Sequence, residues 1–194
     1  SEIGFFCMGE NGLQPLKNIN QELVSQISHA PGSALVSSLE GSRPLLLELQ
    51  ALVVPSKLAM PQRIVSGIDQ KQVALIAAIL EKYLRIKFST YDLFFKVSGG
   101  FKTKESSTDL GIAFALISSY LHKPLPQKSI ALAEISLTGT VQPITNISAH
   151  LHEAKQFGFE HIFIASKQTI DPAYKSLTLH AIATVYDLLN FFPD

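Results

Sequence analysis

The 194-residue sequence has no tryptophan, one cysteine (Cys7) and few charged residues. A single cysteine excludes a disulfide scaffold and is typical of a reducing compartment, so we expect a cytoplasmic protein. No apolar run reaches the about 18 residues that a membrane-spanning helix needs. Residues 1–8 also lack the basic flank and long apolar region of a signal peptide. The sequence therefore predicts no membrane partner.

Charged residues make up 16% of the chain, against about 25% in typical soluble domains. Uncharged groups must cover much of the surface, which favours a buried interface between subunits over an uncharged but solvated surface. Hydrophobic residues make up 46% of the chain and the net charge is zero, and together these values exclude disorder. The length predicts one domain with its own core, or one domain with a fragment of another.

The charge is unevenly spread along the chain. Between Lys57 and Lys104 there are nine Lys or Arg residues and three Asp or Glu residues, whereas acids outnumber bases elsewhere. A basic stretch on a neutral chain can bind a polyanion, because counterion release depends on local charge. A solvated, lysine-rich surface explains the same pattern equally well.

The order of patterns along the chain predicts a mixed α/β fold. The chain starts at Ser1 in the middle of a strand pattern, so we expect a piece of a longer protein. A hairpin with its turn at Asn11-Gly12 comes first, followed by a weakly helical stretch and a boundary near Pro31. Later strands are expected at 34–39, 44–54, 93–97, 130–135, 161–165 and 177–181, and helices at 69–84, 107–121, after Asn146, after Asp171 and after Thr184.

Two helix starts carry specific signals. Asp69 is a candidate N-cap, and Leu75 and Ile79 widen the apolar stripe of the helix that follows beyond a normal amphipathic face. Ser106-x-x-Asp109 has the spacing of a capping box. A stripe of that width suits a surface that contacts another subunit.

Several cofactor motifs are missing from the sequence. It contains no GxxxxGK[ST], CxxC or HExxH pattern. His150 and His152 are two residues apart on an expected helix, so their side chains point in different directions and cannot share a metal ion. We expect two partly exposed histidines and no metal site.

Nucleophilic catalysis is the remaining chemical question. Ser107 lies at a helix start just after Gly99-Gly100, where backbone amides could stabilise an oxyanion. A serine also needs a base to take its proton. Simple helix capping by Ser106 and Ser107 explains the pattern more economically.

A series of positions keeps one order and spacing along most of the chain. They are Pro31-Gly32-Ser33, Leu39-Glu40-Gly41-Ser42-Arg43-Pro44-Leu45-Leu46, Gln50-Ala51-Leu52-Val53, Arg63, Gly67-Ile68-Asp69, Val97-Ser98-Gly99-Gly100, Glu105, Asp109-Leu110, Pro124-Leu125-Pro126, Glu134, Leu137-Thr138-Gly139, Pro143 and Gly158-Phe159. In these positions residues 31–165 resemble the C-terminal domain of the bacterial DNA repair family RadA (Sms). The resemblance implies that residues 1–30 are the end of a RecA-like ATPase core and that residues 31–194 form a separate domain.

That family domain is similar to the proteolytic domain of Lon, a Ser/Lys peptidase with a ribosomal protein S5 domain 2-like fold of mixed sheets and flanking helices. Ser107 falls on the Lon nucleophile position, and Ser148 falls where Lon has its general-base lysine. A hydroxyl cannot replace a desolvated lysine as the base. We therefore expect no enzyme activity in this part of the chain, with a Lon-like serine peptidase that uses Ser107 as the alternative.

The resemblance implies a scaffold role instead. It implies a domain that helps an ATP-dependent DNA repair and recombination protein assemble as a hexameric ring, contacts single- or double-stranded or branched DNA, and works with recombination proteins. ATP, Mg²⁺ and a zinc finger are implied for the parent protein, and no cofactor for this part. A pure oligomerisation module without DNA contact is a further alternative.

The candidate DNA-contacting residues are chosen by charge alone. They are Arg63, Lys71, Lys82, Arg85, Lys87, Lys102 and Lys104. Gln62 and Gln72 stand where the family usually has arginine, so DNA affinity is expected to be weaker than is typical of the family, with a flatter salt dependence.

Overall fold

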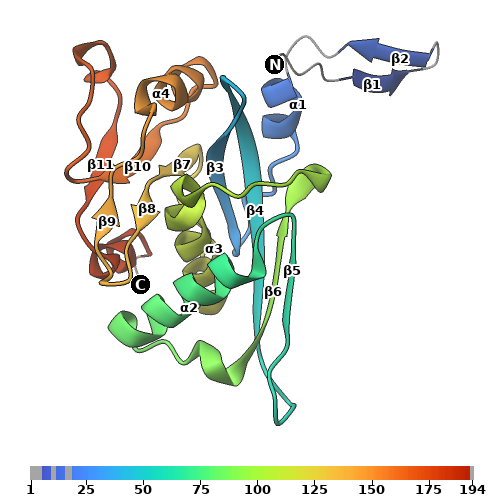
Figure 1. Ribbon diagram of the computed structural model, residues 1–194, viewed down its shortest axis with the longest axis vertical. Coiled ribbons are helices and arrows are strands. Elements are labelled where there is room, and N and C mark those ends of the chain that lie inside the picture. The colour runs from blue at the N-terminus through green and yellow to red at the C-terminus, as the bar shows by residue number, and fades with distance from the viewer. Residues whose placement is uncertain (1–5, 10–11, 16–18, 193–194) are drawn as a thin grey trace.

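A computed structural model describes residues 6–9, 12–15 and 19–192. One seven-stranded sheet forms the body, in the order β11-β10-β7-β3-β4-β6-β5 (Figure 1). Its strands are β3 (Ser33–Glu40), β4 (Arg43–Pro55), β5 (Arg63–Ser66), β6 (Tyr91–Val97), β7 (Ser129–Leu132), β10 (His161–Ala165) and β11 (Leu179–Ile182). The β3–β4 and β4–β6 pairs are antiparallel, and the other neighbours are parallel. The predicted α/β class is confirmed.

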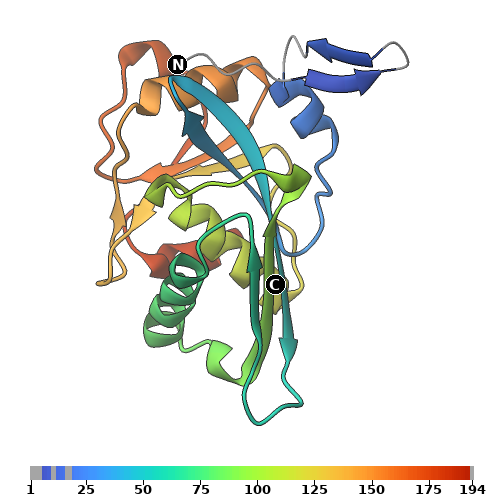
Figure 2. The same ribbon diagram turned by 45° about the vertical axis from the view of Figure 1, so that its right-hand side comes forward.

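Helices cover both faces of this sheet, as two separate cores show. The α-helices of the protein are α1 (Ile19–Ser25), α2 (Gln70–Leu84), α3 (Asp109–Leu121) and α4 (Ile147–Gln156). Helices α2 and α3 pack on the face that carries Leu45, Leu47 and Leu49. Helix α4 packs on the opposite face, which carries Leu46 (Figure 2). The run of apolar residues at the start of β4 is therefore buried on both sides.

The Asn20 side chain ties helix α1 to β4 and to α4. Asn20 Nδ2 donates to the carbonyl oxygen of Pro44 (3.0 Å), and the Leu46 N–H donates to Asn20 Oδ1 (2.9 Å). Asn20 Nδ2 also donates to Glu153 of α4 (2.8 Å). Contacts between α1 and β4 thus cross the boundary predicted near Pro31.

The smaller elements complete the fold. They are β1 (Phe6–Gly9), β2 (Gly12–Pro15), β8 (Glu134–Ile135), β9 (Val141–Gln142), and the short 3-10 helices η1 (Phe88–Thr90), η2 (Ser98–Gly100), η3 (Ser106–Thr108), η4 (Pro172–Tyr174) and η5 (Val185–Phe191). β1 and β2 form the predicted N-terminal hairpin, while its turn residue Asn11 lies outside the described residues. Among the described residues, no helix is long and apolar enough to cross a membrane.

Helix caps follow the sequence in one case and depart from it in another. Asp69 caps α2 by accepting from the Lys71 N–H (2.8 Å). The predicted Ser106–Asp109 capping box is wrong, because Ser106 Oγ donates to Glu134 Oε2 (2.9 Å) and α3 begins without a side-chain cap. A complete capping box forms at Thr184 and Asp187, where a helix was expected after Thr184.

Candidate functional site

A polar cleft of about 400 Å³ opens where η3 and α3 meet the β8–β9 hairpin and α4. Its lining combines hydroxyls, carboxylates and one imidazole. The lining residues are Leu39, Lys104, Glu105, Ser106, Ser107, Glu134, Pro143, Ile144, Thr145 and His150. The cleft therefore contains the serine that sequence analysis aligned with the Lon nucleophile.

The Ser107 hydroxyl faces a carboxylate in this cleft. Ser107 is buried on η3, and its Oγ donates to Glu105 Oε2 (3.1 Å). The same carboxylate oxygen accepts from the Leu39 N–H at the end of β3 (3.0 Å). Strand β3 and the loop before α3 thus fix the acid that holds the hydroxyl. Ser148 is exposed on the first turn of α4 and does not line the cleft.

His150 is the least expected member of the cleft. It is 1% exposed, whereas the sequence predicted partial exposure, so that prediction is wrong. Its Nδ1 shares a hydrogen bond with Ser37 Oγ (2.7 Å) on β3. Burial lowers the pKa of His150, and the nearby Glu105 opposes this effect. A neutral imidazole at pH 7 follows from the lowered pKa.

Asp109 has a buried carboxyl group with a raised pKa. Burial raises its pKa to about 6, although hydrogen bonds from Gln72 Nε2 (2.7 Å) and the Ile135 N–H (3.2 Å) lower it. Glu134 raises the pKa further through like-charge repulsion.

Helix α2 brings together three of the cations predicted to contact DNA. Lys71 and Lys82 are exposed and eleven residues apart, which places both on one face at 100° per residue. Arg85 is exposed at the C-cap, in the left-handed region with φ 58°. The three side chains therefore project from the outer side of one helix.

The other predicted cations lie elsewhere. Lys87 is exposed beside η1, and Lys102 and Lys104 are exposed on the loop before η3. Lys104 lines a second cavity together with Lys71. Arg63 is half-buried, and its guanidinium donates to the carbonyl oxygens of Phe88 (2.7 Å) and Tyr91. A phosphate would have to compete with these carbonyls for Arg63.

Sequence reasoning missed the roles of Glu105, Glu134 and His150 in the cleft. In the sequence, Glu105 and Glu134 stand out only as matching positions of the family pattern. The signal for His150 is its position two residues after the serine aligned with the Lon lysine, but its partner Ser37 lies 113 residues away in sequence. No local pattern reveals such a pair.

Comparison with known proteins places this geometry in context. Residues 69–168 match the family model of subunit ChlI of Mg-chelatase. DNA repair protein RadA of Aquifex aeolicus (strain VF5) is 37% identical over 170 residues, which cover 88% of this chain and 38% of that protein. RadA of Rickettsia bellii (strain RML369-C) is 34% identical over 180 residues, covering 92% and 40%. RadA of Escherichia coli (strain K12) is 31% identical over 195 residues, covering 100% and 42%.

The chain thus spans about two fifths of the length of these relatives. The predicted likeness to RadA is confirmed over most of the chain. The specific likeness to Lon is not part of these matches.

The comparisons correct our expectation that this part is not an enzyme. We had based that expectation on a Lon-like fragment with Ser107 present and Ser148 in place of the lysine. The match to a Mg-chelatase subunit, together with the RadA relatives, indicates that residues 69–168 resemble an ATP-binding module instead. The expectation of a non-enzymatic fragment is therefore wrong.

The expectation of no cofactor is wrong for the same reason, because an ATP-binding module would bind ATP and Mg²⁺. The residues present do not fit these groups. The sequence contains no GxxxxGK[ST] loop. Within residues 6–9, 12–15 and 19–192, no three His, Cys, Asp or Glu side chains are placed to hold a metal ion.

Proposed function

Because this chain belongs to the family described as subunit ChlI of Mg-chelatase and is similar to RadA over most of its length, we propose that it contacts DNA and holds subunits together in an ATP-dependent DNA repair protein. The protein would act in the cytoplasm on single-stranded, double-stranded or branched DNA, with recombination proteins as partners. Its assembly would be a homo-oligomeric ring, with six subunits as the RadA resemblance implies.

The outer face of α2 is the observation that carries the DNA-contact proposal. Lys71 and Lys82 are about 16 Å apart along the helix, from eleven residues at about 1.5 Å each. Arg85 extends the same side by one turn. Within the described part of the chain none of these three side chains forms an ion pair, so each is available to a phosphate. Neutralising phosphates releases counterions, which drives binding.

The edges of this surface have four further candidates for DNA contact, which are Lys87, Lys102, Lys104 and Arg63. Lys104 is the best placed of them, because it shares a cavity with Lys71 at the start of α2. Arg63 is the weakest candidate, since its guanidinium already donates to three backbone carbonyls.

The fold proposed for the body is of the Lon proteolytic-domain type, which is ribosomal protein S5 domain 2-like. The position of Ser107 just before α3, and a β8–β9 hairpin that leads into α4, support this assignment. We propose a division between residues 1–30, as the end of a RecA-like ATPase core, and residues 31–194, as the Lon-like domain.

A charge-reversal experiment tests the DNA contact. The triple variant Lys71→Glu, Lys82→Glu, Arg85→Glu is compared with a matched control, Lys155→Glu, Lys167→Glu, Lys175→Glu, which reverses three exposed lysines elsewhere. Fluorescence anisotropy with labelled DNA over a salt series measures both affinity and salt dependence. The α2 variant should lose at least about tenfold in affinity, with a salt slope flatter by about two to three units, and the control should lose much less. Equal losses in the two variants would contradict the assignment.

A further inference from the structure

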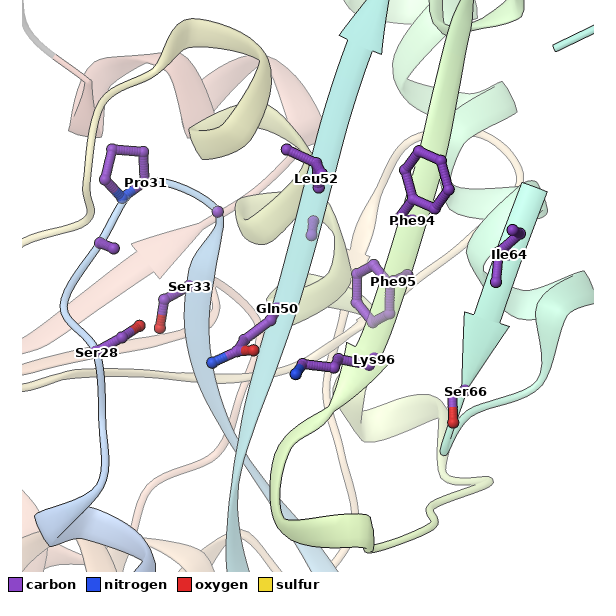
Figure 3. A pocket seen from close by; sticks show the side chains of 13 residues that line it. Ser28, Pro31, Ser33, Gln50, Leu52, Ile64, Ser66, Phe94, Phe95 and Lys96 are labelled. Atoms are coloured by element: carbon purple, nitrogen blue, oxygen red, sulfur yellow. The ribbon is translucent and has the colours of Figure 1, made fainter. Parts of the chain in front are cut away.

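Two cavities in the surface differ in the polar groups of their walls. A cavity of about 530 Å³ lies on the open face of the sheet, where Figure 3 shows Leu52, Phe94 and Ile64 on three neighbouring strands. The buried polar side chain among its lining residues, Ser33, already donates to a carboxylate (2.6 Å). The cleft of about 400 Å³ around Ser107 is different, because its walls leave polar groups without partners.

His150 brings a hydrogen-bond donor to the wall of this cleft. Its side chain is 1% exposed, and its Nδ1 is bonded to Ser37 Oγ (2.7 Å). Ser37 is fully buried, and among the described residues its hydroxyl has no other partner. A buried hydroxyl proton needs an acceptor, so the Ser37 hydroxyl donates to Nδ1. The proton of the neutral imidazole therefore lies on Nε2.

This Nε2–H has no acceptor within the described part of the chain. His150 lines the cleft, and Ser37 on β3 occupies its other ring nitrogen, so Nε2 is the nitrogen left to face the cleft. A buried donor without a partner costs free energy, and an acceptor that enters the cleft removes this cost. His150 therefore favours a ligand with a hydrogen-bond acceptor such as a carbonyl oxygen.

Two carboxylates in the same cleft favour a positive charge. Glu105 Oε2 accepts from Ser107 Oγ (3.1 Å), and Glu134 Oε2 accepts from Ser106 Oγ (2.9 Å). Among the residues that the structure describes, neither Oε1 atom has a hydrogen-bond partner. Lys104 also lines the cleft, but it is exposed and forms no ion pair with either glutamate. The cleft therefore keeps an excess of negative charge and two free carboxylate oxygens.

The donor and the carboxylates lie close enough to bind one small molecule. The charge of Glu105 reaches His150, because it opposes the effect of burial on the pKa of the imidazole. The volume of the cleft is typical of small-molecule sites. A metal ion is a poorer match for this charge, since no set of three His, Cys, Asp or Glu side chains in the described ranges could hold one. An organic cation with a nearby acceptor fits both kinds of wall group.

We infer that the cleft binds an ammonium group that is one carbon atom away from a carbonyl group. The ammonium lies between Glu105 and Glu134, and the carbonyl oxygen accepts from His150 Nε2–H. A free amino acid and the N-terminus of a peptide share this chemistry. The inference goes beyond the proposed function and depends on neither DNA contact nor a ring.

Four small compounds test this ligand chemistry on the 194-residue chain. Glycinamide carries both groups, ethylamine lacks the carbonyl, N-acetylglycinamide lacks the charge, and triglycinamide presents a peptide N-terminus. Nitrogen NMR of the histidine side chains reports the tautomer of His150 and its response to each compound. We expect the Nε2–H tautomer in the free chain and a saturable shift of its signal with glycinamide. Ethylamine and N-acetylglycinamide should each bind at least about tenfold more weakly.

Two isosteric variants test the carboxylates. Glu105→Gln and Glu134→Gln remove one charge each and keep an oxygen that accepts from the serine hydroxyl, so both should fold. Each should weaken glycinamide binding at least about tenfold. Glu160→Gln is the matched control, because Glu160 is 62% exposed and does not line the cleft. The control should bind glycinamide as the wild type does.

The comparison of triglycinamide with glycinamide distinguishes the two sources of the ligand. Binding of triglycinamide that is as tight or tighter assigns the cleft to a peptide N-terminus, weaker binding assigns it to a free amino acid, and either result supports the inference. Glycinamide that gives no saturable shift would overturn it. So would an Nδ1–H tautomer of His150, equal binding of ethylamine or N-acetylglycinamide, or an equal loss in Glu160→Gln.

Discussion

The two halves of the central sheet are built differently, and β4 runs through both. One half of the sheet is parallel and contains β11, β10, β7 and β3. In this half β10, β7 and β3 are buried on both faces, and so is the first half of β4 beside them. Strands β6 and β5 join the second half of β4 and have helices on one face only. Along one side of β4, Leu46 is completely buried and Leu52 is half exposed. The same strand thus serves as core at one end and as surface at the other.

The largest expected effect compares these two leucines directly. Leu46→Ala should lower the free energy of unfolding by about 2–5 kcal/mol, because it leaves a cavity between the sheet and α4. Leu52→Ala should cost less than about 1 kcal/mol in the monomer, since most of its surface already meets water. Urea unfolding at low protein concentration measures both. Equal costs would mean that the second half of β4 is covered in solution.

The next effect concerns Glu48, which lies between the two leucines on the same side of β4. Its buried carboxylate accepts from the Ser28 N–H (3.1 Å), Ser33 Oγ (2.6 Å) and Ser98 Oγ (3.0 Å). Burial by itself raises the pKa of Glu48, but the hydrogen bonds from Ser33 and Ser28 bring it below its ordinary value. Glu48→Ala should cost about 2–3 kcal/mol at pH 7, because it leaves buried donors unpaired.

The pH dependence of Glu48 follows from the direction of its shift. A folded pKa below the unfolded value gives stability that is present above pH about 4.5 and is lost as the pH falls further. Between pH 7 and pH 3 the melting temperature should therefore fall more steeply for the wild type than for Glu48→Gln, whose side chain does not titrate. Parallel curves would contradict this account.

The smallest effect lies at the edge of the parallel half. His161 Nδ1 and His180 Nε2 share a hydrogen bond (3.0 Å) between β10 and β11. Burial, and then the neighbouring His161, lower the pKa of His180. Protonation of His180 is therefore less favourable in the folded state than in the unfolded state. The stability of the fold should fall as the pH drops below about 6.5.

His180→Phe should remove part of that loss, so its stability should fall less than that of the wild type between pH 7 and pH 5. Melting temperatures over this range measure it, with His152→Phe, an exposed histidine on α4, as the control. A similar gain in both variants would show that the His161–His180 pair has no special role.

Local signals predicted much of this fold. Asp69 predicted the start of α2, and the strands expected at 34–39 and 161–165 are present as β3 and β10. Strand β5 was missed because it has four residues and its partner β6 lies about thirty positions later in the sequence. A short strand is determined by its neighbour and not by its own pattern.

The candidate site was less predictable than the fold. Ser107 was found at a helix start, but the Glu105 carboxylate that holds it and the buried His150 depend on where β3 and α4 meet. The cations of α2 share a face because of helical spacing, which the sequence could have shown. The tethered guanidinium of Arg63 depends on tertiary contacts, which it could not.

Asn20 has a consequence for how this chain behaves among crowded neighbours. Strand β4 pairs with β6 only from Leu49 onward, so its first residues lack a strand on that side. The Asn20 carboxamide offers Pro44 and Leu46 one donor and one acceptor, as a passing strand would. A single amide thus occupies a stretch of backbone that would otherwise template edge-to-edge aggregation.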